Sequence, residues 1–456
     1  MRLRTKGGYN VPLAGKPTGE IRALPEPDAL YLPLTSRRFA FTQTVVEDGA
    51  EVAPGEVLAT DPANFDVPLL APRAGTVRLG TVENHITLEN TRREMERPVQ
   101  VGTPDGHSIE VKRRRLVRLG AWQFFEDANT GRLPDPSGVP RAVVVSTARL
   151  EPFGPRGDAQ LAGRLDAFER GLEHLQSLLE YQPIYLVVPD VQSPLAREVH
   201  ESLRGLAYLR IVTIPLRYPF DHFALLARGL GLEADPSRPV WALRTEGVLA
   251  VDRALTACRA CTERIISFGG PAAREPAHLS AVAGYPLEDI LAGALSEEPA
   301  RIINGGALTG ETIGEAQKGL DAECAGLTVL AEPRRRELFA FLRPGWTRRS
   351  YSVCFLSALR RAGPEPLTTA LRGEKRACIA CGFCEEVCPA RIMPHLIHKY
   401  LYSGALDDVE RLGVDLCVGC GLCSYVCPSK IELREEFLEA QEQLAEERQH
   451  AEEPLA

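Results

Sequence analysis

The chain has 456 residues, of which 44% are hydrophobic and 25% charged, as in an ordinary globular protein of roughly three domains. Its net charge of −8 argues against nucleic acid as a partner. No apolar run approaches the roughly 18 residues of a membrane helix, and the N-terminus does not read as a secretion signal. We therefore expect a cytoplasmic location, where thiols stay reduced.

Short apolar runs separated by turns predict an all-β unit near the N-terminus. Asp-Gly, Pro-Gly and Ala-Gly pairs punctuate residues 38–80. The segments VVEDGAEVAPGEVLA and LLAPRAGTV resemble the flattened barrel-sandwich of biotinyl and lipoyl domains, but residues 60–68 lack the lysine that such carriers present. We expect a structural β module at 1–112 rather than a swinging-arm carrier.

One dense basic run follows this module. It reads Lys112-Arg113-Arg114-Arg115. A run of this kind is usually a solvated face, and the second interpretation is a contact with lipid headgroups or a membrane subunit.

Strands then alternate with helices, which predicts a parallel sheet. RAVVVS, IYLVV and LRIVTI are short β-branched runs, and the longer helical segments LAGRLDAFERGLEHLQSLLE and SPLAREVHESLRGL lie between them. Such sheets bind ligands at the carboxyl ends of their strands, yet no G-x-G-x-x-G sequence follows any strand here. We expect a Rossmann-like α/β domain at 113–245 without an assigned nucleotide site.

Residues 246–330 also show a mixed pattern of strand-like and helical runs. ERIISFGG and ARIINGGALTG each join a strand-like run to a double glycine, which either cradles a phosphate or shapes a turn. Cys258 and Cys261 form a C-x-x-C, for which two partly buried thiols are favoured over a redox or metal pair. Residues 331–372 are rich in arginine and are predicted to be a connector.

The last part of the chain carries the most specific signal. Eight of the twelve cysteines form two copies of C-x2-C-x2-C-x3-C-P, the run of bacterial two-cluster ferredoxins. In such proteins the fourth cysteine of each run ligates the other cluster. We therefore predict one [4Fe–4S] cluster on Cys378, Cys381, Cys384 and Cys427, and a second on Cys417, Cys420, Cys423 and Cys388.

Two other uses of these cysteines fit less well. Structural zinc favours two cysteine pairs with a longer gap, and disulfides need an oxidising compartment. The stretch 389–416 between the motifs is long and helical, so we expect an α-helical two-cluster ferredoxin domain at 373–435. The tail 436–456 is expected to be helical and partly disordered. His395 and His398 lie beside the first motif, where they either tune a cluster by hydrogen bonding or lie at the surface.

The order of these parts resembles one family: the RnfC protein of the Rnf electron-transport complex and the NqrA protein of the sodium-translocating NADH:quinone oxidoreductase. KGGYNVPLAGKP and LVRLGAWQFFEDANTGRLPDPSGVPRAVVVSTA look like NqrA. RIISFGGPAAREPAHLSAVAGYPLEDILA with INGGALTG is similar to the soluble ligand-binding β-grasp segment of both, which implies a β-grasp domain at 246–330. The intact cysteine motifs are a feature of Rnf.

The resemblance also bears on flavin. RnfC carries a GxGGAGFP-type loop for flavin mononucleotide, whereas residues 119–125 here read LGAWQFF. Trp122, Phe124 and Phe125 would occupy the space of the phosphate and the ring system, so we expect no bound flavin mononucleotide. Glu151, followed by proline, matches the Glu-Pro of the flavin subunits and stays a weak candidate for cofactor binding.

These observations predict a peripheral electron-transfer subunit on the inner face of the cell membrane. It would relay single electrons through two [4Fe–4S] clusters, within an NADH:quinone or NADH:ferredoxin oxidoreductase complex of the ion-translocating type. No catalytic acid, base or nucleophile stands out. Expected partners are integral membrane and redox subunits, and further candidates are a ferredoxin or an NADH-oxidising subunit. The alternatives are a non-catalytic scaffold that docks a ferredoxin or flavodoxin, and a flavin-dependent NADH-oxidising subunit.

Overall fold

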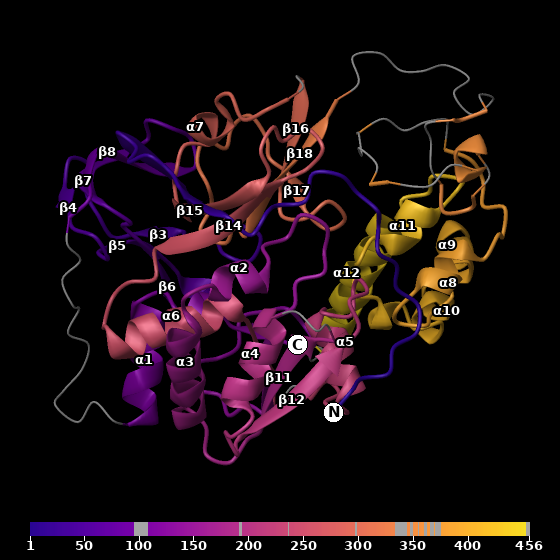
Figure 1. Ribbon diagram of the computed structural model, residues 1–456, viewed down its shortest axis with the longest axis horizontal. Coiled ribbons are helices and arrows are strands. Elements are labelled where there is room, and N and C mark those ends of the chain that lie inside the picture. Colours follow the sequence, from indigo (N-terminus) through magenta and orange to yellow (C-terminus); the bar gives the residue numbers. More distant parts are fainter. Residues whose placement is uncertain are drawn as a thin grey trace.

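The computed structural model of the protein describes residues 1–94, 108–190, 194–235, 237–296, 299–332, 344–346, 350–353, 355–359, 363–364, 369 and 375–452. These residues form a mixed α/β body with four sheets and, beside it, a helical C-terminal region (Figure 1). The expected mixed α/β fold with a helical C-terminal region is therefore present. The predicted connector at 331–372 lies largely outside the described residues, and so does the end of the predicted tail.

Two small antiparallel sheets form the N-terminal unit. One has the strand order β2-β8-β7-β4 and the other the order β3-β5-β6. Their strands are β2 (Ala29–Pro33), β3 (Gln43–Thr44), β4 (Glu51–Val52), β5 (Val57–Asp61), β6 (Val67–Leu70), β7 (Ala74–Leu79) and β8 (His85–Arg92). Leu30, Leu32, Ile86 and Leu88 point into the core and are fully buried. Two of the predicted corners connect these strands, because Gly49 lies between β3 and β4 and Gly55 between β4 and β5, both with positive φ. The third is wrong, since Ala74 and Gly75 lie within β7, where the pairing with β8 shifts in register.

The second unit contains a five-stranded sheet with the order β12-β11-β10-β13-β9, in which the first four strands run parallel and β9 pairs antiparallel with β13. The strands are β9 (Glu126–Asp127), β10 (Ala142–Ser146), β11 (Ile184–Pro189), β12 (Leu209–Ile214) and β13 (Val240–Arg244). The helices of this unit are α1 (Ile109–Arg118), α2 (Gly157–Leu161), α3 (Leu165–Ser177), α4 (Pro194–Leu203), α5 (Phe223–Gly229) and α6 (Thr245–Thr256). The predicted alternation of strands and helices, with parallel pairing, is present.

Both faces of this sheet are covered. Val143 and Val145 of β10 belong to the cluster that includes residues of α3 and α6, whereas Ala142 and Val144 belong to the cluster with α5. Successive residues of a strand point to opposite faces, so the continuous apolar run RAVVVS reflects a strand buried on both sides.

The third unit is a mixed sheet with the order β1-β15-β14-β18-β16-β17. It contains β1 (Ile21–Ala23), β14 (Glu263–Gly269), β15 (Ala277–Val282), β16 (Ala300–Asn304), β17 (Glu311–Thr312) and β18 (Gly326–Ala331), with helix α7 (Leu287–Leu291). Its edge strand β1 comes from the N-terminal segment and pairs in parallel with β15. The N-terminal residues thus contribute to a sheet that is otherwise built from residues after 262.

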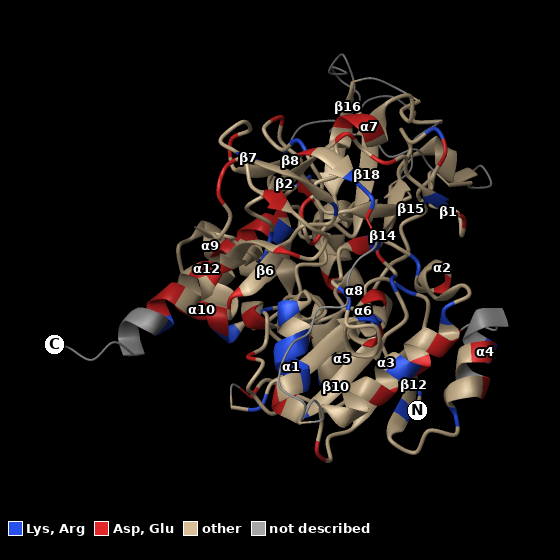
Figure 2. Cartoon of the chain, turned by 90° about the vertical axis from the view of Figure 1, so that its left-hand side faces the viewer, with Lys and Arg blue, Asp and Glu red and all other residues tan. Residues whose placement is uncertain are grey.

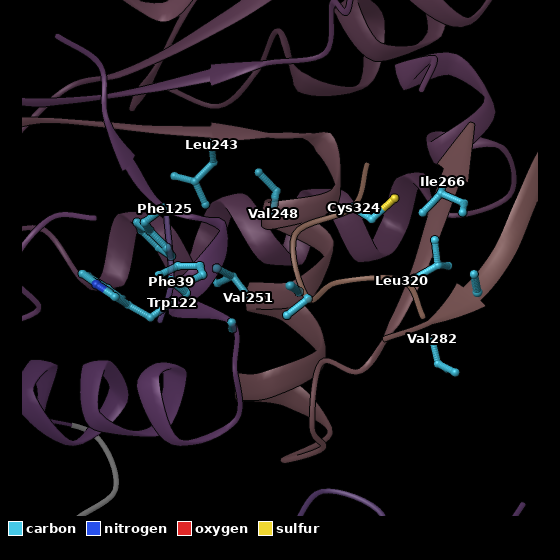
Figure 3. Packing of buried hydrophobic residues seen from close by; sticks show 14 of the residues in the cluster. Phe39, Trp122, Phe125, Leu243, Val248, Val251, Ile266, Val282, Leu320 and Cys324 are labelled. Carbon is cyan, nitrogen blue, oxygen red and sulfur yellow. The ribbon is translucent and has the colours of Figure 1, made fainter. Parts of the chain in front are cut away.

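A hydrophobic core continues across these units. Phe39 of the N-terminal unit belongs to the same cluster as Trp122, Leu243 and Ile266 (Figure 3). Trp122 stacks on Phe125 with ring centroids 4.2 Å apart. This shared core fixes the relative position of the sheets, because separating them would expose these large apolar side chains to water.

The C-terminal region consists of short helices and one long helix. They are α8 (Phe383–Val387), α9 (Pro394–Tyr402), α10 (Leu406–Arg411), α11 (Leu422–Val426) and α12 (Leu433–Glu452). Helix α12 contacts α9, α10 and α11, and its Phe437 is fully buried among Ile397, Val409 and Val414. Within the described part of the chain, no helix is long and apolar enough to cross a membrane.

The N-terminal segment 1–13 links this helical region to the body. The backbone N–H of Leu3 donates to Thr213, that of Gly8 to Val387, and that of Tyr9 to Tyr218, at 2.8–3.0 Å. Figure 1 shows this indigo segment running between the parallel sheet and the yellow helices. The first residues of the chain therefore help to dock the cysteine-rich region.

Candidate iron–sulfur centres

Each cysteine motif folds into the same local unit, a loop followed by one short helix. Gly382 precedes α8 and Gly421 precedes α11, with left-handed φ values of +78° and +74° that favour glycine. Each helix ends at the fourth cysteine, Cys388 or Cys427, whose extended backbone turns the chain away. The first two thiols of a motif thus lie in the loop, the third lies in the first turn of the helix at Cys384 or Cys423, and the fourth follows the helix.

The eight cysteines gather in two pockets of four. The inner pocket is lined by Cys388, Cys417, Cys420 and Cys423. The outer pocket is lined by Cys378, Cys381, Cys384 and Cys427. Each pocket takes its fourth cysteine from the other motif, in the grouping that the sequence predicts.

The donor set of each pocket fits a cubane cluster better than a single ion or a disulfide. Each cysteine that the structure describes is a free thiol. Among the described residues, no three His, Cys, Asp or Glu side chains are arranged to hold one metal ion, although four cysteines line each pocket. Tetrahedral zinc would need all four sulfurs at about 2.3 Å from one point. The spacing C-x2-C-x2-C-x3-C-P in each motif is that of [4Fe–4S] ligands.

Burial also affects the thiols of the two pockets. It raises the pKa of Cys420 to about 12 and the pKa of Cys384 to about 11. A ligand must be a thiolate, which in such surroundings needs nearby positive charge. Iron in the pocket would supply this charge. Within the loops, the backbone N–H groups of Ala380 and Gly419 point to the sulfurs of Cys378 and Cys417 at 3.4 Å.

The two pockets differ in exposure. Cys378 and Cys381 of the outer pocket are exposed, and the side chain of Ile379 between them is 66% accessible. Cys388 and Cys420 of the inner pocket are buried. The outer pocket lies at the protein surface, whereas the inner pocket faces the α/β body.

Residues from distant parts of the chain surround the inner pocket. The Tyr218 hydroxyl donates to the Cys420 carbonyl at 2.7 Å. Arg228 donates to the carbonyl of Leu416 and Arg434 to that of Gly419, both at 2.8 Å. Sequence reasoning missed these three side chains.

The repeat itself could have identified Arg434. It follows Cys427 by the same interval that separates His395 from Cys388, and each of the two residues lines the pocket of its own motif. His395 Nδ1 lies 3.7 Å from Glu385, whereas His398 contacts Glu436 of α12 at 2.6 Å. Of the two histidines singled out by the sequence, only His395 therefore lines a cysteine pocket.

A large cleft opens between the body and the helical region, with a volume of about 1080 Å³. Its wall includes the carboxyl ends of β10 and β13 at Ser146 and Arg244, the edge of a parallel sheet where ligands commonly bind. Cys417 of the inner pocket and Gly306 of a double glycine also line it. The cleft thus joins the sheet edge to the inner pocket.

Comparisons with known proteins match three separate parts of the chain. Residues 108–204 match the NqrA second alpha/beta domain, residues 265–314 the NQRA C-terminal domain, and residues 374–431 a 4Fe-4S dicluster domain. The chain is an NqrA/RnfC-like protein that carries a ferredoxin domain.

Full-length relatives agree with these matches. The NqrA component of the Na(+)-translocating NADH-quinone reductase of Pseudomonas aeruginosa is 27% identical, over 90% of this chain and 92% of the relative. The corresponding component from a Marinomonas species is 25% identical, over 89% and 90%. A solved structure of an NAD+-reducing [NiFe]-hydrogenase in the H2-reduced state is also similar. It is 12% identical, the match covers 76% of this chain and 67% of the hydrogenase chain, and the TM-score is 0.43.

In this NqrA/RnfC-like chain, Glu151 binds a loop of the protein itself. Its carboxylate accepts hydrogen bonds from the Thr309 backbone N–H at 2.9 Å and from the Thr309 hydroxyl at 2.7 Å. A Cβ added at Gly306 would lie 2.3 Å from the Glu151 carboxyl carbon, so the glycine permits this close approach. The double glycine that includes Gly306 thus lies against a carboxylate of the protein itself.

The segment that replaces the glycine-rich flavin loop is mostly core. Trp122 and Phe125 are fully buried and pack edge-to-face against Trp241. Only Phe124 lines the cleft, with the Arg264 guanidinium 4.2 Å from its ring centroid. The side chains of Trp122 and Phe125 turn inward and do not line the cleft. The absence of bound flavin stays a prediction.

Cys258 and Cys261 are partly buried, as predicted. Cys258 follows helix α6 and has a φ of +51°, and Arg115 donates to its sulfur at 3.6 Å. The Cys261 thiol donates to the carbonyl of Ala250 at 3.4 Å.

The basic run on α1 does not form an exposed patch. Blue residues colour much of this helix in Figure 2. Arg113, however, is buried and donates to the carbonyls of Pro136, Gly138 and Leu178. Arg114 is exposed and pairs with Glu110. Four consecutive helical residues point to all sides of a helix, so the interpretation of 112–115 as one contact surface is wrong.

Proposed function

We propose that the chain relays single electrons through two [4Fe–4S] clusters. The observation that carries this proposal is the grouping of eight cysteines into two crossed pockets, within the region that matches a dicluster domain. We assign the inner cluster to Cys388, Cys417, Cys420 and Cys423, and the outer cluster to Cys378, Cys381, Cys384 and Cys427. The clusters, when bound, supply one-electron chemistry. The chain provides their ligands and fixes their separation.

The protein would act at the cytoplasmic face of a membrane-bound, ion-translocating oxidoreductase. Its relatives of similar length are named as components of a Na(+)-translocating NADH-quinone reductase, which supports partners that are integral membrane and redox subunits. The exposed outer pocket, with Cys378 and Ile379 at the surface, would exchange electrons with such a partner. The inner pocket would exchange electrons with the outer one.

We assign the remaining units by the same reasoning. Residues 1–112 would be a biotinyl/lipoyl-like β module and 113–245 a Rossmann-like α/β domain. Residues 246–330 would be a β-grasp domain, which the match at 265–314 supports. A two-cluster ferredoxin domain would span 373–435.

The proposal is tested on full-length chain purified and reconstituted without oxygen. We expect a brown protein with about eight iron atoms per chain, since each [4Fe–4S] cluster holds four, and no change in its visible spectrum on addition of NADH alone. A colourless protein would favour the alternative of a non-catalytic scaffold that docks a ferredoxin or flavodoxin. About four iron atoms per chain would contradict the proposed two-cluster relay.

Assembly is a separate question. In its native host, the protein should pellet with membranes at low salt and stay with integral subunits in mild detergent. Recovery of all the protein in the supernatant, without a membrane partner, would contradict the assignment to a complex.

A flavin-dependent NADH-oxidising subunit is the second candidate. The cleft supports it, because Arg149 and Arg244 line the sheet edge and Cys417 lines the opposite end. The missing glycines of the segment 119–125 oppose it. Acid extraction of the purified protein decides between them: we expect no flavin mononucleotide, and a stoichiometric amount would favour the enzyme.

A further inference from the structure

Two guanidinium groups lie beside the loop that begins the second cysteine motif. Arg228, in the last turn of α5, donates Nη1 to the carbonyl of Leu416, the residue before Cys417. Arg434, near the start of α12, donates Nε to the carbonyl of Gly419, which lies between Cys417 and Cys420. Two elements far apart in sequence thus present permanent positive charge to the same loop.

Both groups are partly withdrawn from water. The Arg434 side chain is 17% exposed and lines the inner pocket, with Glu435 as a half-exposed ion-pair partner at 3.1 Å. Burial lowers the pKa of Arg228, and the thiols of Cys417 and Cys388 oppose that effect. Arginine stays charged in proteins, and both side chains also line the cleft, so solvent there screens only part of their field.

The outer pocket has a different residue at the equivalent place. His395 occupies the position that Arg434 has in the repeat, and the charge of a histidine depends on pH. Arg376 donates to the carbonyl of Pro428, beside Cys427, at 3.1 Å, and Lys375 pairs with Glu432, but these side chains are exposed. Among the described contacts, the permanent cations of the inner pocket are therefore partly buried, whereas those of the outer pocket are exposed.

Burial and these cations act in opposite directions. When one electron leaves the outer cluster and enters the inner one, the inner group gains one negative charge, with no bond made or broken. A buried site disfavours added charge, which by itself would make the inner cluster harder to reduce than the exposed one. Fixed positive charge favours the added electron and offsets this cost.

We propose that Arg228 and Arg434 stabilise the reduced state of the inner cluster and so keep its reduction potential within reach of the outer cluster. This inference rests on the proposed function, because it requires a cluster in each pocket. Both arginines act through the cluster and are positioning residues. They would make electron exchange between the two pockets reversible.

The test is a potentiometric titration of the full-length, two-cluster protein, followed by electron paramagnetic resonance. The signal of the outer cluster is identified first in a Cys388→Ser chain, which lacks an inner ligand. We expect Arg434→Gln and Arg228→Gln each to shift the reduced-to-oxidised ratio of the inner cluster about tenfold towards oxidised, which is about 59 mV for one electron. The outer signal should not move.

Arg434→Lys is the conservative control and should restore most of the inner potential, because it keeps the charge. His395→Gln, at the equivalent outer position, should leave the inner potential unchanged. If the glutamine variants kept eight irons and an unchanged inner potential, or shifted both clusters equally, the inference would be wrong. If Arg434→Gln lost iron, its inner potential could not be measured, and the Arg228→Gln titration would decide whether the inference holds. A parent protein with about four irons would instead refute the proposed function.

Discussion

The inner and outer pockets are built from the same motif and differ in what surrounds them. The outer pocket is closed mainly by its own helical region and leaves Cys378 and Cys381 at the surface. The inner pocket is covered by the N-terminal segment and by residues of the α/β body such as Tyr218 and Arg228. A repeated sequence can thus give one site for exchange with a partner and one site shielded within the protein.

Removing one ligand from each pocket tests whether the two sites are separate. Cys388→Ser should abolish the inner cluster and Cys384→Ser the outer, so that iron falls from about eight to about four atoms in both. Electron paramagnetic resonance should show a different remaining signal in each variant. Loss of the outer signal in Cys388→Ser would break the crossed assignment, since Cys388 belongs to the first motif in sequence.

Removing metal from the intact protein sharpens the difference in exposure. An iron chelator should extract the outer cluster about tenfold faster than the inner, because two of the outer ligands, Cys378 and Cys381, are exposed, whereas the inner ligands are buried or partly buried and only Cys417 among them lines the cleft. The loss of visible absorbance should therefore have two phases, with the outer signal disappearing first. A single phase that removes both signals together would mean that the two pockets are equally accessible.

Two equivalent glycines offer a matched pair of substitutions. An added Cβ at Gly421 would lie 2.7 Å from the Leu308 carbonyl oxygen, whereas one at Gly382 would meet nothing within 4 Å. Both have a positive φ, so Gly382→Ala should cost about 1 kcal/mol from backbone strain alone. Gly421→Ala should cost about 3 kcal/mol, because the strain and the overlap add. Urea titration of each cluster's absorbance measures the difference.

Equal effects at the two glycines would show that the contact between the second motif and Leu308 adds nothing to stability. A larger effect at Gly382 would contradict the docked arrangement of the inner loop.

The smallest expected effect concerns one hydrogen bond. Tyr218→Phe removes the hydroxyl that donates to the Cys420 carbonyl and should weaken retention of the inner cluster by about 1 kcal/mol. Chelator extraction of the outer cluster should keep its rate. An effect on the outer cluster alone would show that the hydrogen bond of Tyr218 does not stabilise the inner pocket.

The sequence predicts much of this arrangement because its signals are local. The spacing of the cysteines determines which thiols share a loop, and the runs at β10, β11 and β12 announce a parallel sheet by their β-branched residues. Other features depend on contacts between distant residues. Nothing near Arg228 or Tyr218 in the sequence indicates a role beside Cys417 or Cys420.

The same limit explains the errors. Residues 112–115 look like one patch in a linear sequence, but a helix distributes them around its axis, and Arg113 is buried. Burial overrides the interpretation of this local segment. The packing of Trp122 and Phe125 against Trp241 is likewise not visible in the sequence, because Trp241 lies more than a hundred residues away.

The most direct test of the account is an experimental structure of the reconstituted full-length protein with the iron atoms located by anomalous scattering. We predict two iron clusters, one bounded by Cys388, Cys417, Cys420 and Cys423, and the other by Cys378, Cys381, Cys384 and Cys427. A single cluster, or Cys388 bound to the iron held by Cys378, would contradict it.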